Sequence, residues 1–284
     1  MPSINEVTYS TPKQPRQLRL DTIARCNASC SSCHRFLTNR QGEMSLMLID
    51  EILNDVRQWP EPLTEIVPVN YGEFSLRKDW IAILMAISQK LPHTQIVLPT
   101  NGSLLDDQKT ILLSKIQTLR VVNFSVNAYF DETYKNFMGL PPENIAKVRR
   151  AVAQLRVLRP DITRWVSMVF DPAYSTDFER DAFIEYWRPY AYPQILPAAS
   201  AGRPAKKPIY PVQLPCRSIF SDIVVGFDRK ISSCCFDPAF SIDLGTYEGD
   251  LLTSWRNAKL EQLRRLHNER LRKEVAICRS CTFA

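Results

Sequence analysis

The chain has 284 residues, of which 45% are hydrophobic and 23% are charged, and these ordinary values exclude wholesale disorder. Its 36 basic and 30 acidic residues give a formal net charge of +6, which permits a nucleic-acid partner without favouring one. The first residues lack the basic and apolar regions of an export signal, and no apolar run approaches about 18 residues. We therefore expect a cytoplasmic protein with no membrane partner.

Strands and helices alternate along the first two thirds of the chain. Alternating apolar residues predict strands, and apolar residues spaced three and four apart predict helices. The predicted strands cover residues 17–24, 65–71, 95–98, 119–127, 164–170 and 192–196. The predicted helices cover residues 44–56, 80–91, 106–116, 145–158 and 177–187. Six such units predict an α/β fold with a parallel sheet, open or curled into part of a barrel.

Polar residues follow the predicted strands where they end. In a parallel α/β sheet, ligands bind at the carboxyl ends of the strands. Each short motif alone is weak, but their joint placement at one rim indicates a binding site. The motifs are Gly72-Glu73 after the second strand, Thr100-Asn101-Gly102 after the third, and Ser125 and Asn127 at the end of the fourth.

Three cysteines follow the first strand, in the order Cys26-x3-Cys30-x2-Cys33. A disulfide framework is disfavoured because the chain is long and has enough core without covalent links. Cubane clusters normally have four cysteine ligands, and no fourth cysteine lies nearby. A site with three ligands leaves one position open for chemistry. His34 is an alternative fourth ligand, although its neighbour Cys33 would already occupy that corner.

The tail has a different composition and a second group of cysteines. Residues 198–215 are rich in proline, alanine and lysine and predict a linker. A hairpin is predicted over 219–234 and a helix over about 251–273, whose basic residues indicate a solvated face more than a nucleic-acid site. We expect two domains, 1–200 and 201–284.

The tail cysteines can form a closed metal site. Cys278-x2-Cys281, with two cysteines upstream, supplies four ligands, and the spacing alone is compatible with zinc or iron–sulfur. Adjacent side chains on a strand point to opposite faces, so one of Cys234 and Cys235 is surplus. Cys216 completes the set.

Together these residues resemble the radical S-adenosylmethionine (radical SAM) superfamily. The resemblance rests on the three-cysteine loop, on Gly72-Glu73 and on Thr100-Asn101-Gly102; the tail resembles the SPASM/twitch extension in its shorter twitch form. It implies a partial (β/α)6 TIM barrel with a small C-terminal α+β cluster domain. The departures are Ser32 and Phe74, where an aromatic residue and proline are usual, and Arg229, where glycine is usual.

The resemblance also implies cofactors and residue roles. A [4Fe-4S] cluster on Cys26, Cys30 and Cys33 would bind S-adenosylmethionine, which is cleaved reductively to a 5′-deoxyadenosyl radical. A flavodoxin- or ferredoxin-type protein would donate the electron. Glu73 and the Gly72 backbone would hold the methionyl amino group. Ser125 and Asn127 would contact the ribose or carboxylate of S-adenosylmethionine, and Thr100, Asn101 and Gly102 would line the same rim. The resemblance further implies one auxiliary [4Fe-4S] cluster, with the ligands Cys216, Cys234, Cys278 and Cys281.

No residue motif names the substrate. Our leading hypothesis is an oxidoreductase, a dehydrogenase that acts on a small hydroxylated or amino metabolite and passes an electron to the auxiliary cluster. One alternative is a maturase of a ribosomal peptide, by epimerisation or cross-linking, and another modifies a nucleotide or nucleic-acid base. A hypothesis from a different class is a non-enzymatic zinc protein that binds nucleic acid through its basic helix.

Overall fold

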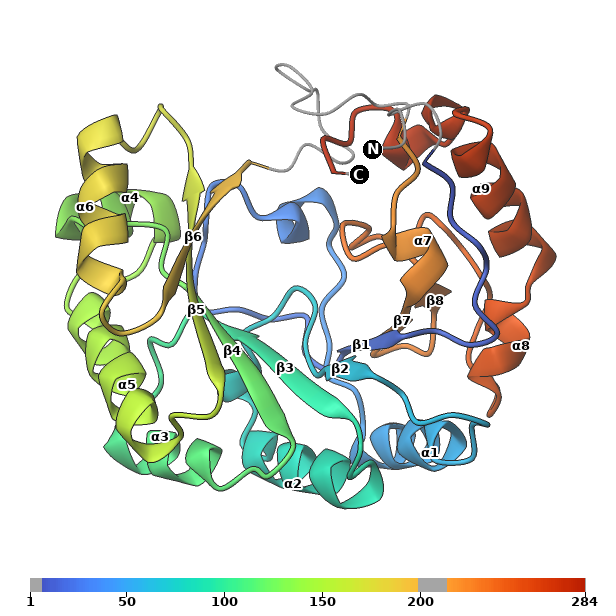
Figure 1. The fold of residues 1–284 in the computed structure, drawn as a ribbon, viewed down its shortest axis with the longest axis horizontal. Helices are drawn as coiled ribbons and strands as arrows, with labels where there is room; N and C mark the ends of the chain where they lie inside the picture. The colour runs from blue at the N-terminus through green and yellow to red at the C-terminus, as the bar shows by residue number, and fades with distance from the viewer. Residues whose placement is uncertain (1–6, 199–213, 284) are drawn as a thin grey trace.

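The computed structural model describes residues 7–198 and 214–283, and its strands form one eight-stranded sheet. The order is β6-β5-β4-β3-β2-β1-β7-β8, and Figure 1 shows the sheet curving between these two ends. All neighbours are parallel except β8, which is antiparallel to β7. The strands are β1 (Gln17–Asp21), β2 (Glu65–Val67), β3 (Gln95–Thr100), β4 (Leu119–Ser125), β5 (Thr163–Phe170), β6 (Tyr192–Pro197), β7 (Asp222–Gly226) and β8 (Ile231–Ser232).

Helices cover the outer face of this curved sheet (Figure 1). Alternate strand residues, such as Leu18 and Leu20 in β1, are fully buried in the hydrophobic core. None of the helices in residues 7–198 and 214–283 combines the length and apolar character needed to cross a bilayer. The α-helices are α1 (Leu46–Val56), α2 (Trp80–Lys90), α3 (Asp107–Ser114), α4 (Asp131–Met138), α5 (Asn144–Leu158), α6 (Asp177–Trp187), α7 (Ser218–Ser221), α8 (Leu251–Trp255) and α9 (Ala258–Asn268).

The predicted parallel α/β architecture is confirmed, with shifts at the strand ends. The second strand was predicted to reach residue 71, but β2 ends at Val67 because the next residue, Pro68, has no N–H to donate. The fourth was predicted to reach residue 127, but β4 ends at Ser125. There Asn127 takes a left-handed backbone with φ of 60°, which ends the extended conformation.

Helix α4 was not predicted from the sequence. Its overall composition is polar, but Tyr134, Phe137 and Met138 are buried at helical spacing. Two sequence signals mark its ends: the acidic Asp131 and Glu132 in its first turn, and Gly139 after its last residue. Gly139 has φ of 64°, the left-handed conformation that commonly ends helices.

The single helix predicted over residues 251–273 is wrong. The structure has two helices, α8 and α9, separated at Arg256 and Asn257. The Asn257 side chain accepts a hydrogen bond from the backbone N–H of Lys259 at 2.8 Å and so begins a new helix. A short 3-10 helix, Arg272–Glu274, follows α9.

The tail hairpin extends the barrel sheet. The predicted hairpin is present as β7 and β8, although residues 218–221 before it form α7 rather than strand. Strand β7 pairs in parallel with β1, with Gln17 opposite Asp222 and Asp21 opposite Gly226. The domain boundary expected at residues 200 and 201, and most of the predicted linker, lie outside the described residues.

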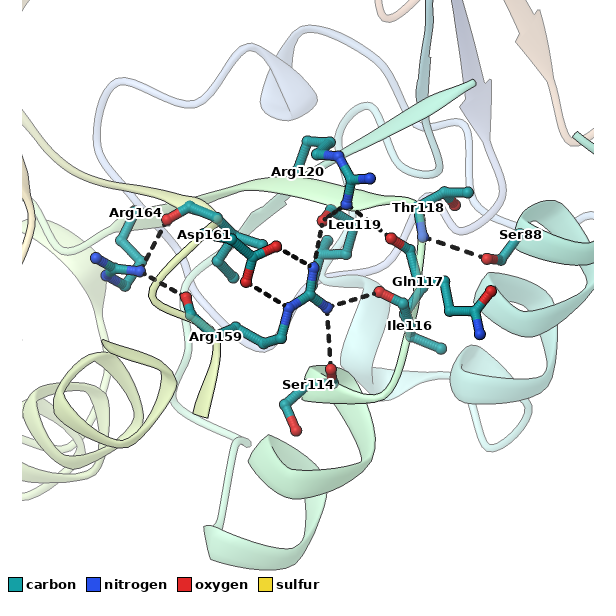
Figure 2. Close-up of polar contacts among 11 residues, drawn as sticks. Ser88, Ser114, Ile116, Gln117, Thr118, Leu119, Arg120, Arg159, Asp161 and Arg164 are labelled. Carbon is teal, nitrogen blue, oxygen red and sulfur yellow. Dashed lines mark hydrogen bonds and ion pairs between the residues drawn. The ribbon is translucent and has the colours of Figure 1, made fainter. Parts of the chain in front are cut away.

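Arg159 lies beside the amino-terminal ends of β4 and β5 (Figure 2). The Arg159 guanidinium donates to the carbonyl oxygens of Ser114 at 3.0 Å and Ile116 at 2.9 Å, where α3 has ended. It also donates to both carboxylate oxygens of Asp161 at 2.8 Å. The last carbonyls of a helix have no hydrogen-bond donor within the helix, and Arg159 supplies donors for these two.

Candidate functional site

The Glu73 carboxylate joins the carboxyl ends of β2 and β3. Its exposed fraction is 2%. Oε1 accepts hydrogen bonds from the Thr100 hydroxyl at 2.8 Å and the Ser75 hydroxyl at 2.6 Å. Oε2 accepts from the backbone N–H of Asn101 at 2.6 Å. The structure therefore brings together three residues that the sequence placed at one rim, and it fixes the carboxylate in a single orientation.

Asn101 connects this rim to the first cysteine loop, residues 26–33. Its side-chain amide donates to Oδ1 of Asn27 at 2.9 Å and lies 3.8 Å from the Cys26 sulfur. The turn depends on Gly102, which has φ of 70° and whose N–H donates to the Thr100 hydroxyl at 3.0 Å. The Thr100–Gly102 turn is thus in contact with both Glu73 and the cysteine loop.

Gly72 lies directly against the chain that enters the first cysteine loop. A β-carbon at this position would stand 2.0 Å from the carbonyl oxygen of Ile23 and 2.8 Å from that of Arg25. The next residue, Glu73, donates its backbone N–H to the same Arg25 oxygen at 2.9 Å. Only glycine allows the two chains to approach this closely.

Helix α4 supports the first cysteine loop from the other side. The backbone N–H of Ser29 donates to the Met138 carbonyl at 2.8 Å, and that of Ser31 to the Phe137 carbonyl at 3.0 Å. The Cys30 thiol donates to the Met138 sulfur at 3.3 Å. A β-carbon on Gly139 would stand 1.8 Å from the Ser29 hydroxyl oxygen. The helix missed in the sequence therefore holds the loop in place.

The three thiols of the loop suit iron–sulfur ligation. Burial raises the pKa of Cys26, and it raises that of Cys30 to about 12; the charge of Cys33 raises both further. Among the described residues, no three His, Cys, Asp or Glu side chains are arranged to hold one metal ion. In a cubane each thiolate binds a different iron, so the sulfurs surround a cluster instead of converging on one ion. The donor set fits a cluster with one iron free of protein ligands.

Ser125 and Asn127 differ in their availability. Ser125 is half-buried at the end of β4 and faces the inner side of the sheet. Asn127 donates to the Met138 sulfur at 3.0 Å and accepts from the backbone N–H of Val169 at 2.8 Å. Both ends of the Asn127 amide are thus engaged within the protein.

The tail cysteines Cys216, Cys234, Cys278 and Cys281 form a second group of thiols. Burial raises the pKa of Cys278 to about 12; Arg272 lowers it, and Cys216 and Cys281 raise it. Burial also raises the pKa of Cys234 well above its usual value, with further increases from Cys235, Cys216 and Cys278. The pKa values of Cys234 and Cys278 are thus each raised by other cysteines of this group.

Cys235 has different neighbours. Burial raises its pKa to about 11, the Arg19 charge lowers it, and the charges of Asp222 and Cys216 raise it. Arg19 and Asp222 lie on the paired strands β1 and β7. Cys235 is thus influenced by the barrel sheet as well as by Cys216, whereas Cys234 is influenced by Cys216 and Cys278.

Aromatic side chains fill the space between the two groups of thiols. Burial raises the pKa of Tyr71 well above its usual value, and the charges of Cys235, Cys234 and Cys33 add to this. Its hydroxyl is buried and has no hydrogen-bond partner in the described structure. The ring of His34 lies 5.3 Å from that of Phe236 and 6.5 Å from that of Tyr71. His34, the alternative fourth ligand, thus packs between the cysteine loop and the tail.

Arg40 fastens the segment after the first cysteine loop to the tail. Its guanidinium donates to Asp228 at 2.6 Å and to the Pro238 carbonyl at 3.0 Å. It also lies over the rings of Phe227, at 4.9 Å, and Phe240, at 4.2 Å. The sequence reasoning singled out neither Arg40 nor Tyr71, because each acts through partners that are distant along the chain.

Comparison with protein families gives one match that covers more than half of the chain. The model described as the radical SAM superfamily matches residues 20–179. A curated relative, GTP 3′,8-cyclase of Pasteurella multocida (strain Pm70), is 28% identical over 127 residues. That match covers 43% of this chain, and the chain spans only about a third (36%) of the relative's length.

Solved structures share the fold at low sequence identity. BtrN in complex with AdoMet and 2-DOIA is 14% identical with a TM-score of 0.61, covering 94% of this chain and 93% of its own. anSMEcpe with bound AdoMet is 15% identical with a TM-score of 0.69, covering 94% and 86%. Streptococcus suis SuiB bound to precursor peptide SuiA is 12% identical with a TM-score of 0.64, covering 96% and 70%.

Proposed function

This chain belongs to the radical SAM superfamily, and from that membership we propose that it is an oxidoreductase acting on a small polar metabolite. The observation that carries the proposal is the fixed Glu73 carboxylate, linked through Asn101 to the loop that contains Cys26. When bound, the reduced [4Fe-4S] cluster supplies the electron that cleaves S-adenosylmethionine to the 5′-deoxyadenosyl radical, which removes a hydrogen atom from the substrate.

The residues of the rim would bind and orient the methionyl end of S-adenosylmethionine. Cys26, Cys30 and Cys33 would hold three irons and leave the fourth for the amino and carboxylate groups. Glu73 would accept a hydrogen bond from the ammonium group, and its own hydrogen bonds with Thr100 and Ser75 keep it from rotating. A buried carboxylate that is already oriented binds a cation with little further loss of entropy.

The second group of thiols would hold an auxiliary [4Fe-4S] cluster. Cys216, Cys234, Cys278 and Cys281 supply four thiolates, and the neighbours of Cys235 support its exclusion from the set. A closed cluster without an open iron suits electron transfer. Held there, such a cluster would supply a one-electron acceptor, in keeping with our proposal that the net reaction is an oxidation. A flavodoxin or ferredoxin would reduce the first cluster.

The inner face of the sheet supports a small polar substrate. This face carries Arg19 in β1, Glu65 in β2, Asn123 in β4 and Gln194 in β6, whereas their sequence neighbours Leu18, Ile66 and Val122 belong to the core. BtrN, which was solved in complex with AdoMet and 2-DOIA, has a similar fold over 94% of this chain. A peptide substrate is the second candidate, since SuiB and anSMEcpe, both solved with peptides, share the fold.

Anaerobic reconstitution tests the proposal. We expect about eight irons per chain, by the four-iron arithmetic of two cubanes, together with 5′-deoxyadenosine after reduction in the presence of S-adenosylmethionine. About four irons with 5′-deoxyadenosine would retain the superfamily reaction and exclude the auxiliary cluster. Bound zinc without iron or cleavage would contradict the proposed function and favour the zinc-protein hypothesis.

A further inference from the structure

The side chain of Arg19 is a charged group on the inner face of the sheet that the proposed steps do not use. It lies in the middle of β1, opposite Val67 of β2 and Val224 of β7. Its neighbours Leu18 and Leu20 point into the core behind the sheet, so Arg19 points the other way. The side chain is half-buried, which leaves part of it accessible from the inner side.

The Arg19 side chain makes no hydrogen bond or ion pair with any described residue, and its Nε is buried without a partner. One carboxylate that the Arg19 charge influences is Asp222, whose pKa is raised by burial and lowered by Arg19. That carboxylate instead accepts a hydrogen bond from the Ser221 hydroxyl at 2.5 Å. A buried donor without an acceptor is costly, so its presence indicates that a ligand or water completes it.

Other unsatisfied polar atoms lie on the same inner side. Oδ1 of Asn123, in β4, is buried without a partner, and so is the hydroxyl of Tyr71. The Asn123 neighbours Val122 and Phe124 are core residues, which places the amide on the inner face. Arg19 Nε, Asn123 Oδ1 and the Tyr71 hydroxyl are thus three buried polar atoms that no described residue satisfies.

We propose that Arg19 binds an oxyanion of the substrate, a carboxylate or a phosphate. This inference rests on the proposed function for the reaction and adds the substrate class. A guanidinium is permanently charged, and its planar donors match the two oxygens of either group. Arg19 stands two residues before Asp21, the end of β1, so the anion would bind about 7 Å from the rim where the cofactor is proposed to bind. The substrate would then be an acidic metabolite whose anionic group is separated from the reacting C–H bond by roughly this distance.

Small anions test the site without knowledge of the whole substrate. The probes are inorganic phosphate and acetate, added to the reconstituted enzyme at constant ionic strength, and the readout is the midpoint of thermal unfolding. We expect a saturable rise in the wild type with at least one anion, because a ligand that binds only the folded state stabilises it. A rise of the unfolding midpoint with phosphate alone would identify the oxyanion as a phosphate, and a rise with acetate alone would identify it as a carboxylate. No rise with either anion would overturn the proposal.

Three variants assign the effect to Arg19. Arg19→Gln should need at least tenfold more anion for the same rise, since a charge-assisted hydrogen bond is lost. Arg19→Lys keeps the charge but loses the planar fork, so it should weaken the effect less and serves if the glutamine variant fails to fold. Arg188→Gln removes the same charge from an exposed position and should behave as the wild type. An equal rise in Arg19→Gln and wild type would overturn the proposal.

The anion measurement and the reaction can fail separately. Anion binding through Arg19 in a protein that does not cleave S-adenosylmethionine would contradict the proposed function and leave the anion site intact. Cleavage of S-adenosylmethionine by a protein that binds neither anion would exclude the Arg19 anion site and leave the proposed function intact.

Discussion

A β-carbon on residue 72 would stand 2.0 Å from the carbonyl oxygen of Ile23, so Gly72 is in direct contact with the backbone that leads into the first cysteine loop. Both partners are backbone, which neither rotates nor folds away. This contact fixes how far Glu73, the next residue, lies from the loop. Because Gly72 has no side chain, the Glu73 carboxylate can lie as close as it does to the thiols of the first cysteine loop.

Gly72→Ala should destabilise the protein by about 3 kcal/mol, at the upper end of typical overpacking costs, because backbone must move to admit the methyl group. The measurement is the free energy of unfolding together with iron per chain. Gly249→Ala is the control: nothing lies within 4 Å of its β-carbon, but its φ is 101°. It should cost about 1 kcal/mol from backbone strain alone. Equal costs at the two positions would contradict the steric explanation.

Replacement of any cysteine of the first loop tests the site of cleavage. Cys26→Ala, Cys30→Ala and Cys33→Ala should each abolish formation of 5′-deoxyadenosine, because two thiolates cannot hold the cluster firmly. Iron on the tail cysteines should remain, at about four per chain. Cleavage at the wild-type rate in any of the three variants would show that the loop does not carry the reaction.

Cys278 and Cys235 form a matched pair in the tail. Cys278→Ala should remove the auxiliary iron and lower solubility, since metal binding contributes to the folding of small metal-bound segments. Cys235→Ala should keep all the iron, because the charges that influence Cys235 most are those of Arg19 and Asp222, ahead of that of Cys216. Iron analysis of the two variants decides the ligand set, and loss of iron in Cys235→Ala alone would reverse the assignment.

The buried carboxyl of Asp21 makes stability depend on pH. Burial raises its pKa to about 6; Arg40 and the backbone N–H of Tyr71 lower it, and Asp228 raises it. Because the folded pKa lies above the unfolded value of 3.8, folding favours the protonated acid, and stability falls as the pH rises from about 4 through 6. Above pH 6 the loss is about 3 kcal/mol.

Asp21→Asn should remove this loss, because asparagine stays neutral at every pH. Its gain in unfolding free energy over the wild type should be about 1 kcal/mol larger at pH 7.5 than at pH 5. Denaturant titration at the two pH values under anaerobic conditions measures the difference. A gain that does not change with pH would show that the Asp21 carboxyl does not titrate in this range.

The strands and the rim could be predicted because their signals are local. Apolar alternation marked all six strands of the barrel, and the short motifs after β2 and β3 are held together by Glu73 as adjacent parallel strands require. Asn127 lies just after the end of β4, and its amide contacts Met138 and Val169. The contact with the cofactor that the resemblance implies for Asn127 stays a prediction.

Features that depend on contacts distant in sequence could not be predicted. Helix α4 is polar overall, and its buried residues make sense only once the cysteine loop packs against it. The pairing of β7 with β1 gives no signal in either strand, because the alternation in β1 and the apolar run in β7 predict strands without naming their partners. Arg40 resembles any surface arginine until the tail supplies Asp228 and Phe240. The break before α9 had a readable signal in Asn257.

The pairing of β1 with β7 also governs the order in which the chain can fold. The two strands are about 200 residues apart in sequence, yet Gln17 and Asp222 are partners. Until β7 has been synthesised, β1 presents an open edge of unpaired N–H and C=O groups, the kind of edge that recruits strands from other chains. Such distant pairings form late and slowly. A nascent chain that stops before β7 should therefore aggregate, because the barrel wall is completed only after residue 226 has been synthesised.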